Sequence, residues 1–150
     1  MRRGEVIYCP RYTFLDGGQD DKLLINLNDP APNEPNIFVL TTSQQHSMIK
    51  KEGCFSNSGY YAIPENRDFF VKEMTWILFT TVRELSFKEE LRESWKGNFE
   101  TKGYLKNETV NAIINCLKGT NKYLTNYQIM LLKTQLTLPL SDKPKILQQP

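Results

Sequence analysis

Two apolar runs with no helical segment between them limit the possible folds more than any other feature of this chain. They occupy residues 23–27 and 37–40, and both have the composition of buried strands. The segment between them, residues 28–35, contains three prolines and two asparagines, as a turn or loop does. Parallel neighbours need a long crossover, usually a helix. We therefore expect antiparallel pairing, and the pattern argues against a doubly wound parallel sheet.

Other short runs rich in β-forming residues predict more strands. Their ranges, with those of the first two, are 5–9, 22–28, 36–42, 59–63 and 74–79, the last continuing toward Val82. Pro10 is expected to end the first strand because it cannot donate a ladder hydrogen bond. Residues 43–57 are polar and aperiodic, which predicts a loop with at most one helical turn.

Three helices are expected in the second half of the chain. Ser86 and Glu89 have the spacing of a capping box for a helix that runs to about Trp95. Asn107 is the expected cap of a second helix, which ends before Gly119 and carries an apolar stripe. A third begins near Asn126. The combination predicts an α+β, mainly β fold: a strongly bent antiparallel sheet or barrel with helices packed at one side. The stripe of the second helix consists of Val110, Ile113, Ile114 and Leu117.

Length and charge place the chain in an ordinary globular class. With 150 residues and a formal net charge of +2, it fits a single domain, expected over 1–138. A proline-containing tail, 139–150, is expected to be poorly ordered. No apolar run approaches the roughly 20 residues of a membrane span, and the amino terminus lacks a signal-peptide pattern. We therefore expect a cytoplasmic protein with no membrane partner.

The cysteines and the single histidine offer little chemistry by their spacing. Cys9, Cys54 and Cys116 are too few and scattered for a disulfide framework or a zinc site, so three reduced thiols are expected. His46 is interpreted as an exposed loop residue. A Cys54–His46 nucleophilic pair in a small-molecule hydrolase is the competing interpretation. No metal site is predicted, because these residues cannot supply four ligands locally.

Five short motifs, taken in order, resemble a known family. They are the opening Arg3–Tyr8, the loop Gly17-Gly18-Gln19, an apolar strand ending in Asn28-Asp29, a strand closing on Thr41-Thr42-Ser43, and Gly103–Val110 leading into a helix. In this order they resemble the MazF/PemK family, the small ribonuclease toxins of bacterial toxin–antitoxin pairs. The resemblance covers roughly residues 3–118.

The resemblance implies both a fold and an activity. Members have an SH3-like β-barrel, form homodimers and cut single-stranded RNA without a metal or other cofactor. The 2′-hydroxyl of the RNA is the nucleophile, and the products carry 2′,3′-cyclic phosphate and 5′-hydroxyl ends. A cognate antitoxin neutralises such a toxin, and its disordered acidic tail would cover the RNA groove.

The resemblance also implies a catalytic set, from which this chain departs at one position. Thr42 matches the family's threonine at the end of the third strand, with Ser43 as its helper. Lys22 stands near the place of the family's arginine, and a lysine is a point donor rather than a planar fork. In the competing interpretation, Lys22 is an ordinary solvated residue. The threonines would then only satisfy strand propensity.

The expected RNA-binding residues lie mostly in the loop after the first strand. A cation among aromatic rings can clamp unpaired bases, although Tyr12 and Phe14 are equally compatible with the core. Because the family arginine is missing, the alternative function is an inactive SH3-like module that binds nucleic acid or a protein. The expected substrate-binding residues are Arg11, Tyr12, Phe14, Gly17, Gly18, Gln19 and Gln44.

Overall fold

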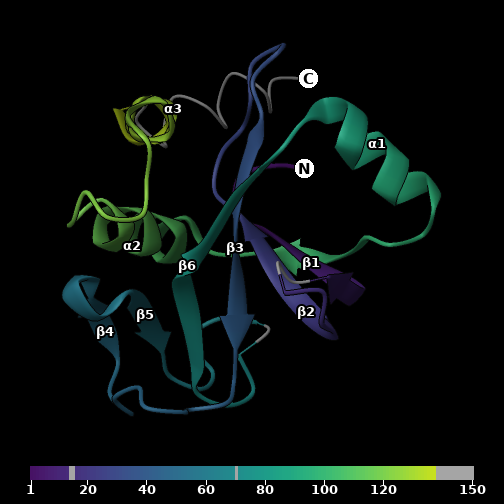
Figure 1. Ribbon diagram of the computed structural model, residues 1–150. Coiled ribbons are helices and arrows are strands. Elements are labelled where there is room, and N and C mark those ends of the chain that lie inside the picture. The colour runs from purple at the N-terminus through teal and green to yellow at the C-terminus, as the bar shows by residue number, and fades with distance from the viewer. Residues whose placement is uncertain (14–15, 70, 138–150) are drawn as a thin grey trace, which may run out of the picture.

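The computed structural model describes residues 1–13, 16–69 and 71–137. Phe14 and the predicted tail, 139–150, lie outside the described residues. The fold is α+β and mainly β, as predicted, and the strands form one antiparallel sheet in the spatial order β4-β5-β6-β3-β2-β1-β7 (Figure 1). The strands are β1 (Glu5–Thr13), β2 (Gln19–Asn26), β3 (Asn36–Thr42), β4 (Gly53–Phe55), β5 (Tyr60–Ile63), β6 (Thr75–Leu85) and β7 (Glu100–Tyr104).

The two apolar runs form the centre of this sheet. β2 pairs antiparallel with β3, and Leu24 lies opposite Leu40, which confirms the expected pairing. The side chain of Asn28 ties the proline-rich connection together. Its amide nitrogen donates to the carbonyl of Pro35 at 3.0 Å, and its amide oxygen accepts from the backbone N–H of Ile37 at 2.8 Å. The predicted bounds of β3 are confirmed, whereas β2 begins three residues earlier than expected.

The sheet is bent but not closed, so the expected barrel is wrong. β4 and β7 stand at opposite ends of the strand order and do not pair with each other. Register shifts interrupt the pairings of β1 with β2, of β1 with β7 and of β3 with β6. Such bulges increase the local twist and bend the strands. The two edge strands are only three and five residues long, which gives them little edge for closure.

Pro10 does not end β1, contrary to the prediction. The strand continues to Thr13, and its register with β2 shifts between Cys9 and Tyr12. Pro10 therefore lies in a bulge, where no ladder bond is required of it. Arg11 has a positive φ of 55° in the same bulge, and its backbone N–H donates to Asp21 Oδ1 at 3.1 Å.

Side-chain alternation divides the core between the two faces of the sheet. Ile37 and Val39 of β3 belong to the larger cluster, which contains residues of α2 (Asn107–Leu117) and α3 (Asn126–Thr137). Phe38 and Leu40 point to the opposite face and belong to a second cluster. Helix α1 (Phe87–Trp95) lies over that second face, so the expectation of helices at one side is wrong (Figure 1).

The helix termini confirm one predicted cap and correct another. Ser86 and Glu89 form the predicted capping box of α1. The N-cap of α2 is Lys106 rather than Asn107, and no side chain of its own turn caps it. The buried carboxylate of Asp68 replaces that cap, since Oδ2 accepts from the Lys106 N–H at 3.1 Å and from the Thr109 hydroxyl at 2.9 Å. The cap thus comes from a distant segment. The predicted apolar stripe of α2 is buried, which confirms it: Val110, Ile113, Ile114 and Leu117.

A disulfide corrects the expectation of three reduced thiols. Cys54 on β4 is bonded to Cys116 on α2, their Cα atoms are 5.5 Å apart, and only Cys9 is a free cysteine. Residues 43–57 were expected to form a loop with at most one helical turn. They contain the strand β4 and a short 3₁₀ helix at Ser56–Ser58, and β4 places Cys54 beside helix α2. The Cys54–His46 nucleophile is also wrong, because an oxidised sulfur has no thiolate to attack with.

Two further observations concern the length of the helices and the burial of Trp76. In the ranges described above, no helix combines the length and the apolar character needed to cross a membrane. Trp76 is 2% exposed, and its indole N–H donates to the Ile49 carbonyl at 3.1 Å. It is therefore a core anchor rather than a platform for bases.

Candidate functional site: two hollows beside strand β2

Lys22 and Thr42 line one hollow, at the start of β2 and the end of β3. The pairing of β2 with β3 ends at Leu24–Leu40, and beyond it the Thr41 hydroxyl still donates to the Leu23 carbonyl at 3.4 Å. The separate motifs at the start of β2 and the end of β3 are therefore brought together, as the sequence predicted.

These two residues border a hollow of about 350 Å³ at the end of the sheet where β2 begins and β3 ends. We call it the Lys22 hollow. The segment before β6 supplies residues that the sequence analysis did not assign to the site. The lining consists of Asp20, Asp21, Lys22, Leu23, Thr41, Thr42, Ser43, Gln44, Lys72, Glu73 and Thr75.

Lys22 is not an ordinary solvated lysine. Its side chain is only 18% exposed, and Nζ lies 3.9 Å from Oδ2 of Asp20, whose side chain is 63% exposed. Most lysines keep the ammonium group in bulk water. The Lys22 side chain therefore packs along the hollow and holds its ammonium group beside Asp20.

Hydroxyl and amide groups complete this edge of the hollow. Thr42 is 8% exposed, and its hydroxyl oxygen accepts from the Gln44 backbone N–H at 3.2 Å. A hydroxyl that accepts one bond still has its proton to donate. The Thr41 hydroxyl instead donates to the Leu23 carbonyl at 3.4 Å, so its proton is engaged within the sheet. Thr42 is therefore the better donor toward a ligand than Thr41. Ser43 is exposed beside it.

The charges of the Lys22 hollow nearly balance. Lys22 and Lys72 lie in the same hollow as Asp20, Asp21 and Glu73. The carboxylate of Asp21 turns toward β1, where it accepts from the Arg11 N–H. A hydrogen bond from the Tyr8 hydroxyl to Asp21 raises the pKa of that tyrosine. The site thus offers two cations, donor hydroxyls and at least one carboxylate that can take up a proton.

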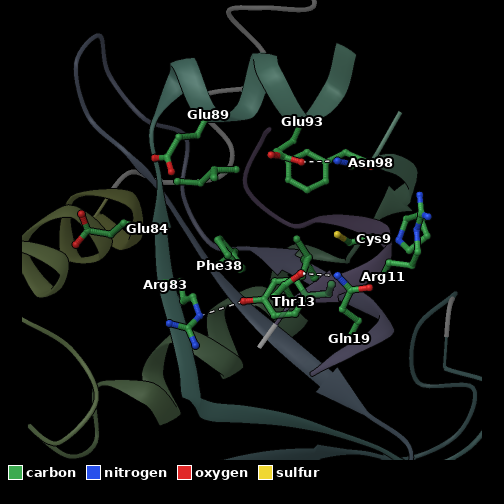
Figure 2. A pocket seen from close by; sticks show the side chains of 15 residues that line it. Cys9, Arg11, Thr13, Gln19, Phe38, Arg83, Glu84, Glu89, Glu93 and Asn98 are labelled. Carbon is green, nitrogen blue, oxygen red and sulfur yellow. Dashed lines mark hydrogen bonds between the residues drawn. The ribbon is translucent and has the colours of Figure 1, made fainter. Parts of the chain in front are cut away.

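A second hollow, of about 520 Å³, lies between the sheet and helix α1 (Figure 2). We call it the α1 slot. Its floor is apolar, with Leu24, Phe38 and Phe99, while glutamates from α1 form one wall. Arg83 of β6 stands on the sheet side. The remaining lining residues are Cys9, Pro10, Arg11, Tyr12, Thr13, Gln19, Glu84, Leu85, Glu89, Glu93 and Asn98.

The predicted substrate-binding residues divide between the two hollows. Arg11, Tyr12 and Gln19 line the α1 slot, and Gln44 lines the Lys22 hollow. Tyr12 is half-buried against the second core cluster, and its hydroxyl accepts from Arg83 Nε at 3.0 Å. It is therefore partly a core residue, the alternative left open by the sequence.

The glycines of the first loop line neither hollow. Gly17 and Gly18 are exposed in the turn between β1 and β2. There Asp16 Oδ1 accepts from the Gly18 N–H at 2.9 Å, a local turn bond. Nothing in this geometry brings the two glycines to the candidate site.

The residues that the sequence did not assign to a site come from distant segments. Lys72 and Glu73 reach the Lys22 hollow because β6 pairs with β3, with Trp76 opposite Thr42. Arg83 reaches the α1 slot because β6 pairs with β3, with Arg83 opposite Phe38, and Glu93 reaches it because α1 lies over the sheet. The capping box predicted α1 itself, but no local pattern indicated which face the helix covers.

Two titratable groups of the α1 slot have perturbed pKa values. Burial raises the pKa of the Cys9 thiol, and the charge of Glu93 raises it further. The hydrogen bonds from Ser86 lower the pKa of Glu89, so that carboxylate is ionised at neutral pH. Cys9 is therefore a weak nucleophile at pH 7, since only the thiolate reacts.

Neither metal ligands nor similarity to known proteins assigns a function to the two hollows. No group of three or more histidine, cysteine, aspartate or glutamate side chains in the described ranges is arranged to hold a metal ion. No protein-family model matches the sequence, and no curated protein matches it.

Proposed function

We propose that this protein is a MazF/PemK-like toxin that cleaves single-stranded RNA at the Lys22 hollow. The observation that carries the proposal is the convergence of a mostly buried lysine side chain with hydroxyl donors on one concave surface. Lys22 is 18% exposed there, and Thr42 and Ser43 line the same hollow. A phosphodiester needs this combination of positive charge and hydrogen-bond donors.

The proposed reaction is a transesterification within the RNA. The 2′-oxygen attacks the neighbouring phosphorus and the bond from phosphorus to the 5′-oxygen breaks, which leaves a 2′,3′-cyclic phosphate and a 5′-hydroxyl. The proton of the 2′-hydroxyl passes to the carboxylate of Asp20, and the leaving 5′-oxygen takes a proton from the ammonium group of Lys22 or from water. Lys22 and the Thr42 hydroxyl hold the charge of the pentavalent intermediate.

The finer fold assignment and the partners belong to the same proposal. The bent sheet would be an open relative of the SH3-like arrangement, and two chains would form a homodimer in the cytoplasm. An antitoxin with an acidic disordered segment would block the hollow by contacting its lysines. A small reading frame beside this gene that encodes such an acidic protein would support this part of the proposal.

The test uses a fluorescent single-stranded RNA in buffer with EDTA. We expect cleavage with new 5′-hydroxyl ends, which a polynucleotide kinase can label. An RNA with 2′-deoxyribose at the cleaved position should remain intact, because it lacks the nucleophile. Lys22→Ala should slow cleavage by about 100-fold or more, the usual cost of losing one transition-state donor. Intact RNA at high protein concentration would refute the proposal.

A second candidate is a module that binds RNA without cutting it. The lining of the Lys22 hollow includes carboxylates and no arginine, and this favours the second candidate. Arginine would hold a phosphate with two parallel bonds, whereas lysine offers a point charge. This function predicts RNA retention that weakens steeply with salt, with no turnover. Salt titration of binding to a non-cleavable 2′-deoxy oligonucleotide separates it from a protein-binding module.

A further inference from the structure

The α1 slot holds charges of both signs that do not neutralise one another. Arg11 and Arg83 share it with Glu89 and Glu93 of α1, whereas the carboxylate of Glu84 accepts from Gln128 of α3 at 2.9 Å. None of the ion pairs among the described residues joins either arginine to any of these glutamates. Opposite charges held apart over an apolar floor suit a flat ligand that has a donor edge and an acceptor edge.

The sheet side of the slot presents an oriented guanidinium group. Arg83 Nε donates to the Tyr12 hydroxyl at 3.0 Å, and Figure 2 shows this contact below the helix. The bond fixes the plane of the guanidinium group and leaves its terminal nitrogens as donors. Such a fork pairs with two adjacent acceptors.

The helix side presents an oriented carboxylate. Figure 2 shows Glu93 reaching from α1 toward the sheet, and the Asn98 side-chain amide donates to its Oε2. The effect of this charge on the Cys9 pKa agrees with a place inside the slot. A carboxylate has about four acceptor positions, so Glu93 can accept two more bonds after the one from Asn98.

The floor between these walls suits an aromatic ring. Leu24 and Phe38 are buried in the second core cluster, and Phe99 packs against them. Unpaired bases stack on such side chains. The volume of about 520 Å³ lies in the usual range of small-ligand pockets, roughly 300–1,000 Å³.

We infer that the α1 slot binds a guanine base of the RNA, held between Glu93 and Arg83. Among the four bases, guanine alone has two adjacent donors, N1–H and the N2 amine, that match one carboxylate. Its O6 and N7 acceptors match an arginine fork. Adenine and cytosine place an acceptor beside their amine, and uracil has no exocyclic amine.

This inference rests on the proposed function, because it assigns base selectivity to the same RNA-binding surface. Leu24 and Lys22 are two residues apart on one face of β2, a separation of about 7 Å along a strand. A base in the slot is therefore close to a phosphate in the Lys22 hollow. The two hollows would read and cut neighbouring parts of one RNA strand.

The test measures nucleotide binding without any cleavage. Isothermal titration with 2′-deoxyguanosine 5′-monophosphate (dGMP) should give a dissociation constant at least about tenfold below those of the adenine, cytosine and uracil analogues. Glu93→Gln and Arg83→Gln should each weaken dGMP binding by roughly 10- to 100-fold, since each removes a paired contact. Glu65→Gln, a change at an exposed residue outside both hollows, is the charge-matched control.

The outcomes separate this inference from the proposed function. Glutamine at position 93 keeps an oxygen for Asn98, so the fold should persist, and a thermal melt checks this. Lys22→Ala should slow RNA cleavage by about 100-fold or more, while dGMP still binds more tightly than the other three nucleotides. Equal binding of all four nucleotides, or dGMP binding insensitive to both slot variants, would overturn the guanine assignment. Selective dGMP binding with intact RNA would refute cleavage alone.

Discussion

Reduction of the Cys54–Cys116 disulfide should destabilise the protein strongly. The bond closes a loop with a sequence separation of 62 residues. In the chain-entropy model, the bond lowers the entropy of the unfolded chain by about 14 cal/mol/K for such a loop, which is about 4 kcal/mol at 25 °C. Domains of this kind are stable by roughly 5–15 kcal/mol in total, so the loss is a large fraction.

The assay compares one protein in two redox states, so that no side chain is removed. Urea unfolding followed by tryptophan fluorescence is measured with and without a phosphine reductant. With a slope of about 2 kcal/mol/M, a loss of about 4 kcal/mol lowers the midpoint by about 2 M urea. Unreduced protein in denaturant should show one reactive thiol, from Cys9, and reduced protein three.

A matched control isolates the bond. In a Cys9→Ser protein, the reductant should still lower the midpoint by the same amount, while the unreduced thiol count falls to zero. Hydrogen exchange should show that opening is greatest at β4, a three-residue edge strand paired only with β5. An unchanged midpoint on reduction, or three thiols in unreduced protein, would refute the reasoning.

Three further changes test individual contacts. Asp68→Ala should destabilise the protein by about 3 kcal/mol in urea unfolding, because it removes the acceptor of the buried Thr109 hydroxyl and of the partly buried Lys106 N–H at the start of α2. Ser86→Ala should lower the free energy of unfolding by about 1 kcal/mol at pH 7. The folded-state pKa of Glu89 lies below its ordinary value of 4.5, so the stability that this carboxylate contributes to the wild type is present above pH 4.5 and lost as the pH falls through the folded-state pKa. Native Cys9, 6% exposed and with a raised pKa, should react with iodoacetamide far more slowly at pH 7.5 than a free thiol does; equal rates would contradict its burial.

Local sequence signals predicted the centre of the fold well. The bounds of β3 were correct because an apolar run stands between Pro35 and a polar serine, so both ends are marked by composition. The capping box located the start of α1 for the same reason, since its two partners are three residues apart. These features depend only on neighbouring residues.

Features that depend on distant residues were not predictable. β4 and β7 are short strands that exist because longer strands beside them supply partners. The bulge that carries β1 past Pro10 depends on the register with β2. Cys54 meets Cys116 only after β4 and α2 have docked, so the spacing of the cysteines contained no sign of the bond.

In the candidate site too, local motifs predicted some residues, and contacts between distant segments supplied the others. The two strand-end motifs predicted that Lys22 and Thr42 come together, because antiparallel strands joined by one turn bring one start beside one end. The pairing of β6 with β3 brought in Lys72 and Arg83, and the docking of α1 brought in Glu93. The sequence predicted that Arg11 and Tyr12 bind RNA, and the structure places both in the α1 slot rather than in the Lys22 hollow.

The most direct test of the central claim is the cleavage rate of a single-stranded RNA in EDTA by two lysine variants. Lys22 lines the hollow, and Lys51 is an exposed lysine outside it. The account predicts that Lys22→Ala loses about 100-fold or more in rate, whereas Lys51→Ala cleaves like the wild type. Equal rates for the two variants and the wild type would contradict a catalytic centre at Lys22.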